Sequence, residues 1–317
     1  MSDMIVTDNL TRTFKSTRAL DGLTLSIPKG DVFGFIGPNG AGKTTTIRIL
    51  ATLLTPSRGR AFLGGIDVVR KPDSAKRLMG YMPDHIGIYD DMLVEEYLHF
   101  FAAAYRIHGA ERERVVDDVL SLTDLEGKRE SPVRALSRGM SQRLGLARVL
   151  LHDPEVLLLD EPAAGLDPRA RIEFKELVAE LRDMGKTIFI SSHILSEIAE
   201  MCTSIGIIEA GRLLYSGPIE DVKNQLSAEA GRILRIRVTS GEARAQEMAL
   251  DALRNHPLVA GIREDHGFLF ARLRPDAGDA SPIAADLVGR GFALHHFSEE
   301  EMGLEEVFMR ITKGDVR

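Results

Sequence analysis

Residues 37–44 read Gly37-Pro38-Asn39-Gly40-Ala41-Gly42-Lys43-Thr44. The segment follows Val32–Ile36, an unbroken apolar run typical of a strand buried on both faces, and a helical pattern continues from Thr44 to Leu54. A glycine-rich loop in this position predicts phosphate binding by backbone amides and by the helix N-terminus. Lys43 would reach the β- and γ-phosphates, and Thr44 would hold Mg²⁺. The alternative, a glycine-rich turn with an exposed lysine, leaves the flanking strand and helix unexplained.

A second apolar run, Val156–Leu159, ends in two carboxylates, Asp160 and Glu161. Open α/β sheets bind their ligands at the carboxyl ends of the strands, so two acids at this point suggest a chemical task. Asp160 is predicted to bind Mg²⁺, directly or through water, and Glu161 to polarise the attacking water as a general base. The alternative is a strand that ends in a solvated acidic turn, and the pair alone does not decide between the two.

The chain has 317 residues, of which 44% are hydrophobic and 27% are charged. This composition is typical of an ordinary globular protein. With 40 basic and 47 acidic residues the formal charge is −7, which argues against a nucleic-acid partner. Cys202 is the single cysteine, which indicates a reducing compartment and no disulfide. No apolar stretch reaches the roughly 18 residues of a membrane span, so we expect a cytoplasmic protein whose membrane role comes only through a partner.

Strand and helix patterns alternate along residues 1–225, which predicts an α/β domain with a mainly parallel sheet. Residues 59–68 are expected to form a strand and Met79–Met82 another. Amphipathic helices over Leu93–Tyr105 and Glu111–Leu122 predict a helical subdomain at about 85–150, inserted into the sheet. The polar stretch Asn224–Gly231 is interpreted as a linker.

Residues 231–317 have a different pattern, in which strands and helices follow the order βαββαβ. That order predicts a small α+β domain with a ferredoxin-like fold. A short helix is expected to follow over Leu304–Ile311.

The segment Leu136-Ser137-Arg138-Gly139-Met140, followed by an apolar-faced helix, connects the first two motifs to a known family. A small hydroxyl and a glycine at a helix N-terminus make an anion site, although Ser137 could equally be a helix cap only. With the phosphate loop before it and the acidic pair after it, the chain resembles the ATP-binding subunit of an ATP-binding-cassette (ABC) transporter. Arg138 and Met140 stand at the third and fifth positions of the family signature, usually Leu-Ser-Gly-Gly-Gln.

The resemblance implies roles for further residues, each taken from its matching position. Asp167 corresponds to the dimer-contact loop and His193 to the switch histidine that touches the γ-phosphate. Phe14 matches the aromatic residue that stacks on adenine, with a core phenylalanine as the alternative. The implied fold is a P-loop cassette whose parallel core sheet is joined by an antiparallel N-terminal sheet. The implied ATP contacts are Phe14, Gly37, Pro38, Asn39, Gly40, Ala41, Gly42, Lys43, Thr44, Thr45, Ser137, Gly139 and Asp167.

Asp84 stands where the family normally has glutamine. By its position we expect it to act in catalysis and near Mg²⁺, together with the metal ligands Thr44 and Asp160. A carboxylate can replace the amide oxygen there, but it adds negative charge beside Asp160 and Glu161. We expect this departure and Arg138 to affect the rate of turnover and not the class of reaction.

The resemblance extends to the C-terminal domain of daunorubicin-resistance-type ATPases, down to Leu304-Glu305-Glu306-Val307-Phe308. It implies the motor of an ABC-2-type exporter, in which two copies enclose two ATP molecules and drive a separately encoded membrane subunit from the inner face of the cell membrane. Two alternatives are a soluble cassette protein acting on ribosomes or DNA, and a nucleotide-binding regulator with little turnover. The chain lacks the paired cassettes or the long coiled coil of the former, and ATPase activity would exclude the latter.

Overall fold

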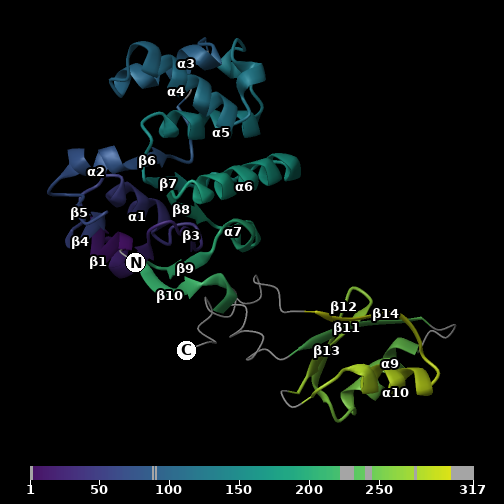
Figure 1. The fold of residues 1–317 in the computed structure, drawn as a ribbon. Coiled ribbons are helices and arrows are strands. Elements are labelled where there is room, and N and C mark those ends of the chain that lie inside the picture. The colour runs from purple at the N-terminus through teal and green to yellow at the C-terminus, as the bar shows by residue number, and fades with distance from the viewer. Residues whose placement is uncertain are drawn as a thin grey trace. The chain divides into compact units, whose positions relative to one another are not determined.

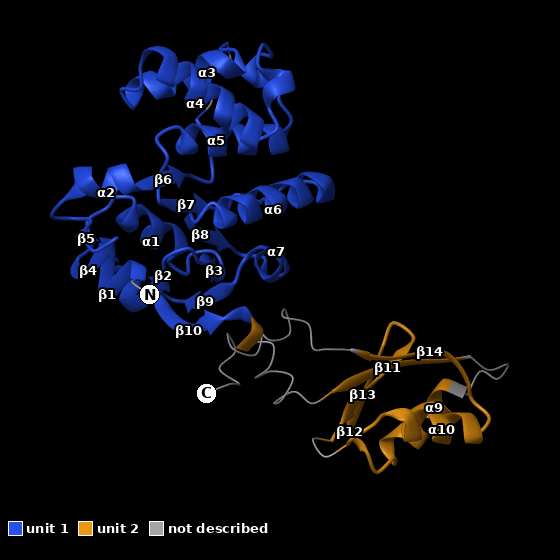
Figure 2. Cartoon of the chain, viewed as in Figure 1, with its two compact units in different colours: residues 1–219 blue, residues 220–317 orange. Residues whose placement is uncertain are grey.

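The structure is a computed structural model that describes residues 3–87, 89, 91–221, 232–239, 245–274 and 277–300. The chain divides into two compact units, residues 1–219 and 220–317 (Figure 2). Each unit has its own cluster of buried apolar side chains. The linker predicted at residues 224–231 and the helix predicted at 304–311 lie outside the described residues.

The centre of the first unit is a six-stranded sheet in the order β10-β9-β3-β8-β7-β6 (Figure 1). All neighbouring pairs are parallel except β9 and β10, which form an antiparallel hairpin. Every residue of β3, β7 and β8 is buried, which agrees with the apolar runs Val32–Ile36, Val156–Leu159 and Ile188–Ile190 within them. The strands are β3 Val32–Ile36, β6 Met79–Met82, β7 Val156–Asp160, β8 Thr187–Ser192, β9 Ser204–Glu209 and β10 Arg212–Pro218.

A second sheet in this unit is antiparallel and has the order β2-β1-β4-β5. The single strand predicted at residues 59–68 is wrong, because the structure has two short strands that pair with each other. Gly64 and Gly65 lie between them with φ of 53° and 77°, a conformation that favours glycine and reverses the chain. The strands are β1 Asp3–Phe14, β2 Thr17–Pro28, β4 Arg58–Leu63 and β5 Ile66–Asp67.

Helix α1 (Lys43–Leu50) packs against strands of both sheets. It ends before the predicted Leu54, since Thr52 has φ of 62° and the helix cannot continue through it. Helix α2 (Pro72–Leu78) was not predicted; it is a seven-residue helix with a proline in its first turn. Helices α6 (Pro168–Asp183) and α7 (Leu195–Met201) pack against each other.

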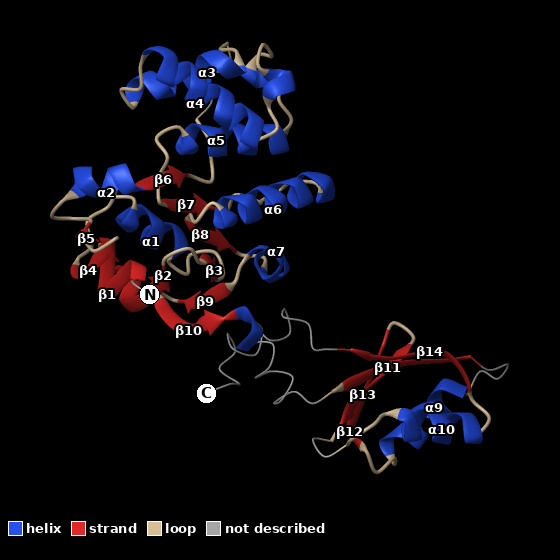
Figure 3. Ribbon diagram, viewed as in Figure 1, coloured by secondary structure: helices blue, strands red, loops and turns tan. Residues whose placement is uncertain are grey.

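A group of helices lies between β6 and β7, in the region where the sequence predicts a helical subdomain. It consists of α3 (Val94–Ala104), α4 (Gly109–Leu122), α5 (Arg138–Leu150) and two 3₁₀ turns, Glu126–Lys128 and Val133–Ala135. Figure 3 shows these helices as a layer of their own. In the described part of the chain, no helix is both long enough and apolar enough to cross a membrane.

The second unit has the predicted βαββαβ order and a four-stranded antiparallel sheet, β12-β13-β11-β14. Strand β13 lies between β11 and β12, and both helices cover the same face (Figure 1). This is the ferredoxin-like arrangement. Its elements are β11 Ile233–Thr239, α9 Ala245–Arg254, β12 Val259–Asp265, β13 Phe268–Leu273, α10 Ser281–Gly289 and β14 Ala293–Glu300.

Candidate active site

The phosphate loop runs from the end of β3 to the start of α1, as the sequence predicts. Gly42 is the N-cap of α1 with φ of 115°, which a residue with a side chain rarely adopts. Lys43 is only 6% exposed, and its Nζ donates to the carbonyl oxygens of Gly37 at 2.7 Å and Pro38 at 3.3 Å. The lysine therefore folds back over the loop that precedes it.

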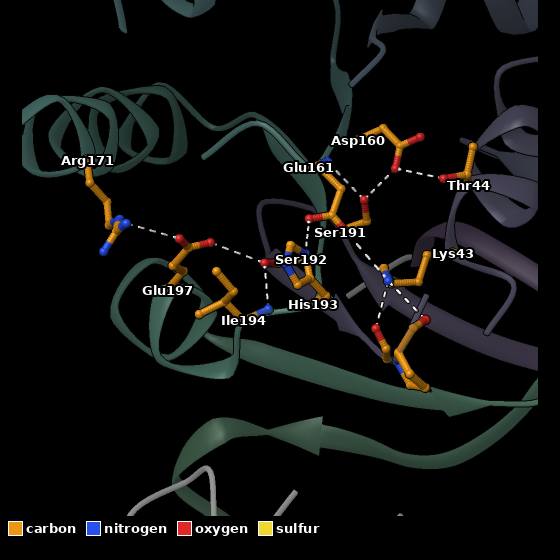
Figure 4. A network of polar contacts seen from close by, with 12 residues as sticks. Lys43, Thr44, Asp160, Glu161, Arg171, Ser191, Ser192, His193, Ile194 and Glu197 are labelled. Atoms are coloured by element: carbon orange, nitrogen blue, oxygen red, sulfur yellow. Dashed lines mark hydrogen bonds and ion pairs between the residues drawn. The ribbon is translucent and has the colours of Figure 1, made fainter. Parts of the chain in front are cut away.

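Asp160 lies at the end of β7, fully buried beneath the phosphate loop. Its Oδ1 accepts hydrogen bonds from Ser191 Oγ at 2.6 Å and Thr44 Oγ1 at 3.3 Å (Figure 4). Burial raises the pKa of Asp160, and the charges of Asp84 and Glu161 act in the same direction, while the two hydrogen bonds oppose it. Its Oδ2 has no hydrogen-bond partner among the described residues. A buried, unpartnered carboxylate oxygen beside a hydroxyl is the donor set that Mg²⁺ prefers.

Glu161 follows with φ of 51°, an uncommon value for a residue with a side chain. Its backbone N–H donates hydrogen bonds to the carbonyl oxygen of Ser191 at 3.2 Å and to Ser191 Oγ at 3.0 Å. Its carboxylate lies between two nitrogens, with Oε1 3.4 Å from Lys43 Nζ and Oε2 2.8 Å from His193 Nδ1. The structure thus joins Lys43, Glu161 and His193, which are far apart in sequence.

A cavity of about 520 Å³ opens above these groups. Most of the predicted nucleotide residues line it, together with the predicted catalytic ones. Gly37 and Pro38 contribute the carbonyl oxygens that bind Lys43, and Asp160 lies behind Thr44. The lining comprises Phe14, Ala19, Asn39, Gly40, Ala41, Gly42, Lys43, Thr44, Thr45, Asp84, His85, Arg138, Glu161, Ala164 and His193.

Phe14 lies at the end of β1, where 42% of it is exposed. The alternative of a core phenylalanine does not agree with this exposure. One face of the ring is covered by the Arg12 guanidinium, whose Cζ is 4.5 Å from the ring centroid. The ring therefore lies at the wall of the cavity, and its contact with adenine stays a prediction.

Asp84 reaches the cavity from the loop after β6, with 48% of its side chain exposed. Its Oδ1 accepts the His85 backbone N–H at 2.9 Å, so the carboxylate also caps a local turn. The charge of Asp84 contributes to the raised pKa of Asp160. Asp84 therefore acts on Asp160 through its charge, while its role in catalysis stays a prediction.

Ser137, Gly139 and Asp167 lie away from the phosphate loop and line a different cavity of about 350 Å³. Ser137 is the N-cap of α5 and accepts the Met140 backbone N–H at 3.3 Å. Asp167 is the N-cap of α6 and accepts the Ala170 backbone N–H at 2.8 Å. Two helix N-termini thus meet at this second cavity.

Arg138 is one of four lining residues of the first cavity that the sequence analysis did not assign to it, with Ala19, His85 and Ala164. Its guanidinium lies against Gly165, where an added Cβ would come within 2.7 Å of Cζ. Gly165 has φ of 69° and lies one residue from Ala164, which also lines the cavity. No sequence pattern places the start of α5 against this turn. Ser191 was also missed as a partner of Asp160 and Glu161, although its place at the end of a buried strand was a usable signal.

Comparison with known proteins agrees with this geometry. A family model described as "ABC transporter" matches residues 20–164. The daunorubicin resistance ATP-binding protein DrrA3 of Streptomyces coeruleorubidus is 33% identical, covering 100% of this chain and 98% of its own length. The bacitracin transport ATP-binding protein BcrA of Bacillus licheniformis is 39% identical over 71% of this chain and 73% of its own length.

Among solved structures, an ATP-binding subunit of an ABC transporter superposes with a TM-score of 0.63 at 30% identity. The match covers 71% of this chain and 93% of that subunit. Together with the geometry of the phosphate loop and the acidic pair, these similarities identify the fold as a P-loop ATPase cassette and the reaction as ATP hydrolysis. The chain belongs to the family of ATP-binding subunits of ABC transporters, and within it resembles the daunorubicin-resistance type.

Proposed function

We propose that this ATPase is the motor of an ABC-2-type exporter and works as a pair of identical copies. One observation carries the proposal: the predicted ATP contacts of a single chain lie in two cavities. The phosphate loop, Glu161 and His193 line the first, and Ser137, Gly139 and Asp167 line the second. A site that uses both sets needs the first cavity of one copy and the second cavity of another, which gives two equivalent sites in a symmetric dimer.

Within such a site, each group of this chain has a distinct task. Lys43 places its charge where the β- and γ-phosphates would bind, and the N-terminus of α1 adds its dipole. Glu161 accepts a proton from the attacking water, and the contacts at 3.4 Å and 2.8 Å with Lys43 and His193 hold its carboxylate toward the cavity. Ser137 and the N-terminus of α5, supplied by the second copy, would bind the γ-phosphate.

Mg²⁺ fits the residues present, because Asp160 Oδ2 is buried without a partner and Thr44 Oγ1 is adjacent. We propose that Thr44 and Asp160 hold the ion, with Asp84 near it. When bound, Mg²⁺ neutralises phosphate charge and lowers the repulsion among the carboxylates.

The membrane partner is proposed to bind the helical subdomain. Tyr89 and Phe100 are 52% and 49% exposed and touch edge to face, with ring centroids 5.7 Å apart. Exposed aromatic side chains that cluster are typical of protein interfaces. The names of the two relatives, which refer to daunorubicin resistance and bacitracin transport, support export as the process. A motor bound to such a membrane partner would act at the inner face of the cell membrane.

The dimer is tested with Glu161→Gln, which keeps the shape of the side chain but cannot accept the proton. With ATP and Mg²⁺ this variant should have twice the monomer mass by light scattering after sizing chromatography. The matched control, Lys43→Ala/Glu161→Gln, should stay monomeric. A Glu161→Gln chain that stays monomeric at saturating ATP would contradict the proposal.

The membrane partner is tested by cross-linking through an introduced thiol. Cys202 is buried, so Phe100→Cys adds the only exposed thiol of the described residues. It should cross-link to a multi-span membrane protein in native membranes, identified by mass spectrometry. Leu53→Cys, which replaces a residue that is 61% exposed and outside the aromatic pair, is the control. Equal cross-linking from both positions would argue against a partner at this surface.

A further inference from the structure

His193 lies in a turn between β8 and α7 (Figure 4). The buried carboxylate of Glu197, in α7, binds this turn through Ser192. Ser192 Oγ donates to Glu197 Oε2 at 3.2 Å and accepts the backbone N–H of Ile194 at 3.0 Å. The side chain of Glu197 is 3% exposed. The residues on either side of His193 are thus tied together by one hydroxyl, and Glu197 fixes that hydroxyl.

The same carboxylate also faces α6. Arg171 Nη2 lies 3.4 Å from Glu197 Oε1 and donates to the carbonyl oxygen of Leu166 at 3.3 Å. Leu166 directly precedes Asp167, the N-cap of α6 at the second cavity. A continuous path of contacts therefore runs from the Leu166–Asp167 segment through Arg171 and Glu197 to the turn of His193.

The ion pair in this path is not optimally arranged. Glu197 Oε1 and Arg171 Nε have no hydrogen-bond partner among the described residues, although the two charges are close. Burial raises the pKa of Glu197, and Arg171 opposes that shift. Only the carboxylate of this pair is buried, since the Arg171 side chain is 39% exposed. Ion pairs of this kind add little net stability, but they fix geometry.

We infer that Glu197 and Arg171 are positioning residues that hold His193 against Glu161 and couple it to the Leu166–Asp167 segment. Neither side chain lines the cavity of the phosphate loop, so both act through the turn and not on the nucleotide. The inference rests on the role proposed for His193. Contacts that a second copy makes at Asp167 would thereby alter the placement of His193 in the first copy.

The chain contains a matched control pair between the same two helices. Lys175 and Glu200 join α6 and α7 with a nitrogen–oxygen distance of 3.6 Å, and their side chains are 43% and 62% exposed. Removing either charge perturbs the α6–α7 contact without touching the turn of His193.

The experiment compares Glu197→Gln and Arg171→Met with Glu200→Gln and Lys175→Met. The first two variants should lower kcat roughly tenfold to a hundredfold, as expected for lost support of a catalytic group, with an unchanged Kd for ATP. The control variants should match the wild type. Arg171→Lys, which keeps the charge, should restore most of the rate. The double variant Arg171→Met/Glu197→Gln should lose less than the product of the single losses, because both act on one contact.

Two further measurements separate positioning from general destabilisation. The imidazole ¹⁵N signals of His193, assigned with His193→Ala, should move in Glu197→Gln and Arg171→Met but not in Glu200→Gln. The urea midpoints show whether each variant folds, and Arg171→Met still tests the inference if Glu197→Gln does not fold. Rates and His193 signals equal to those of Glu200→Gln would overturn the inference. A wild-type rate for His193→Ala would instead remove the role proposed for His193 itself.

Discussion

At the scale of single residues, Glu161 has a strained backbone and a carboxylate that lies between Lys43 and His193. A φ of 51° costs about 1–3 kcal/mol for a residue with a side chain, and the two hydrogen bonds from its N–H to Ser191 hold it in place. The strained backbone turns the carboxylate toward Lys43 and His193. A strained backbone conformation at a residue that lines a ligand cavity is typical of a catalytic position.

We predict that Glu161→Gln lowers the rate of ATP hydrolysis by about 10²–10⁴, because an amide cannot accept the proton of water. The affinity for ATP should be retained, since Lys43 and the phosphate loop are unchanged. Single-turnover hydrolysis and calorimetric titration measure the two quantities. Glu155→Gln, which removes a surface carboxylate paired with Lys29, is the control. A Glu161→Gln variant as fast as this control would remove Glu161 from the catalytic role.

Asp84→Gln should retain ATPase activity but raise the Mg²⁺ concentration for half-maximal rate roughly fivefold, which is about 1 kcal/mol for a half-exposed carboxylate. The physical reason is that the charge of Asp84 acts on Asp160 and attracts the cation. Asp84→Ala should instead lose turnover. Initial rates over a Mg²⁺ titration test this. If both variants match the wild type in rate and Mg²⁺ requirement, Asp84 only caps its turn.

At the scale of elements, strand register brings the site together. Asp160 of β7 pairs with Ser191 of β8, so the carboxyl ends of neighbouring strands meet as the sequence predicts. The phosphate loop, the acidic pair and His193 could therefore be located from sequence. The contact of Arg138 with Gly165 could not, because it depends on how the start of α5 packs against a distant turn, which no local periodicity records. The contact of Glu197 with Ser192 could not either, because it depends on the conformation of the turn between β8 and α7.

His152 gives an element-scale prediction about the join between α5 and the core sheet. Its Nε2 lies 3.0 Å from the carbonyl oxygen of Met79 in β6, and its ring stacks on Tyr105. Burial lowers its pKa below the usual 6.5, against the opposing effect of the Met79 hydrogen bond. Since the unfolded chain takes up the proton first, the contribution of His152 to stability is complete above pH 6.5 and is lost as the pH falls below it.

The matching variant is His152→Gln, which keeps a donor for the Met79 carbonyl but does not titrate. We expect the stability of the wild type relative to this variant to fall between about pH 7 and pH 5. Urea unfolding across that range measures the difference, and effects of other histidines cancel because both proteins contain them. A difference that does not change with pH would contradict the lowered pKa.

At the scale of the whole molecule, residues 220–317 have a core of their own, which includes Leu234, Ile236, Leu269 and Ile283. We therefore predict that deleting residues 232–317 leaves a folded chain with unchanged ATP affinity, and that it weakens self-association or binding of the membrane partner. Calorimetry and light scattering test the two parts. A truncated chain that cannot bind ATP would show that the C-terminal unit is part of the nucleotide-binding fold.

The central claim is that each ATP site is built from two copies, and mixing two defective chains tests it most directly. Lys43→Ala damages the phosphate loop. Ser137→Asp keeps an N-cap for α5 but places a negative charge where the γ-phosphate would bind. Each variant alone should be inactive, whereas a mixed dimer contains one site with both defects and one intact site.

Equal co-expression forms mixed dimers as half of the population, so ATPase activity should recover to about a quarter of the wild-type value if the two sites act independently. Lys43→Ala mixed with the double variant Lys43→Ala/Ser137→Asp has no intact site and should stay inactive. Recovery in the first mixture and not in the second is the result that the two-copy site predicts. A first mixture no more active than its two components would contradict it.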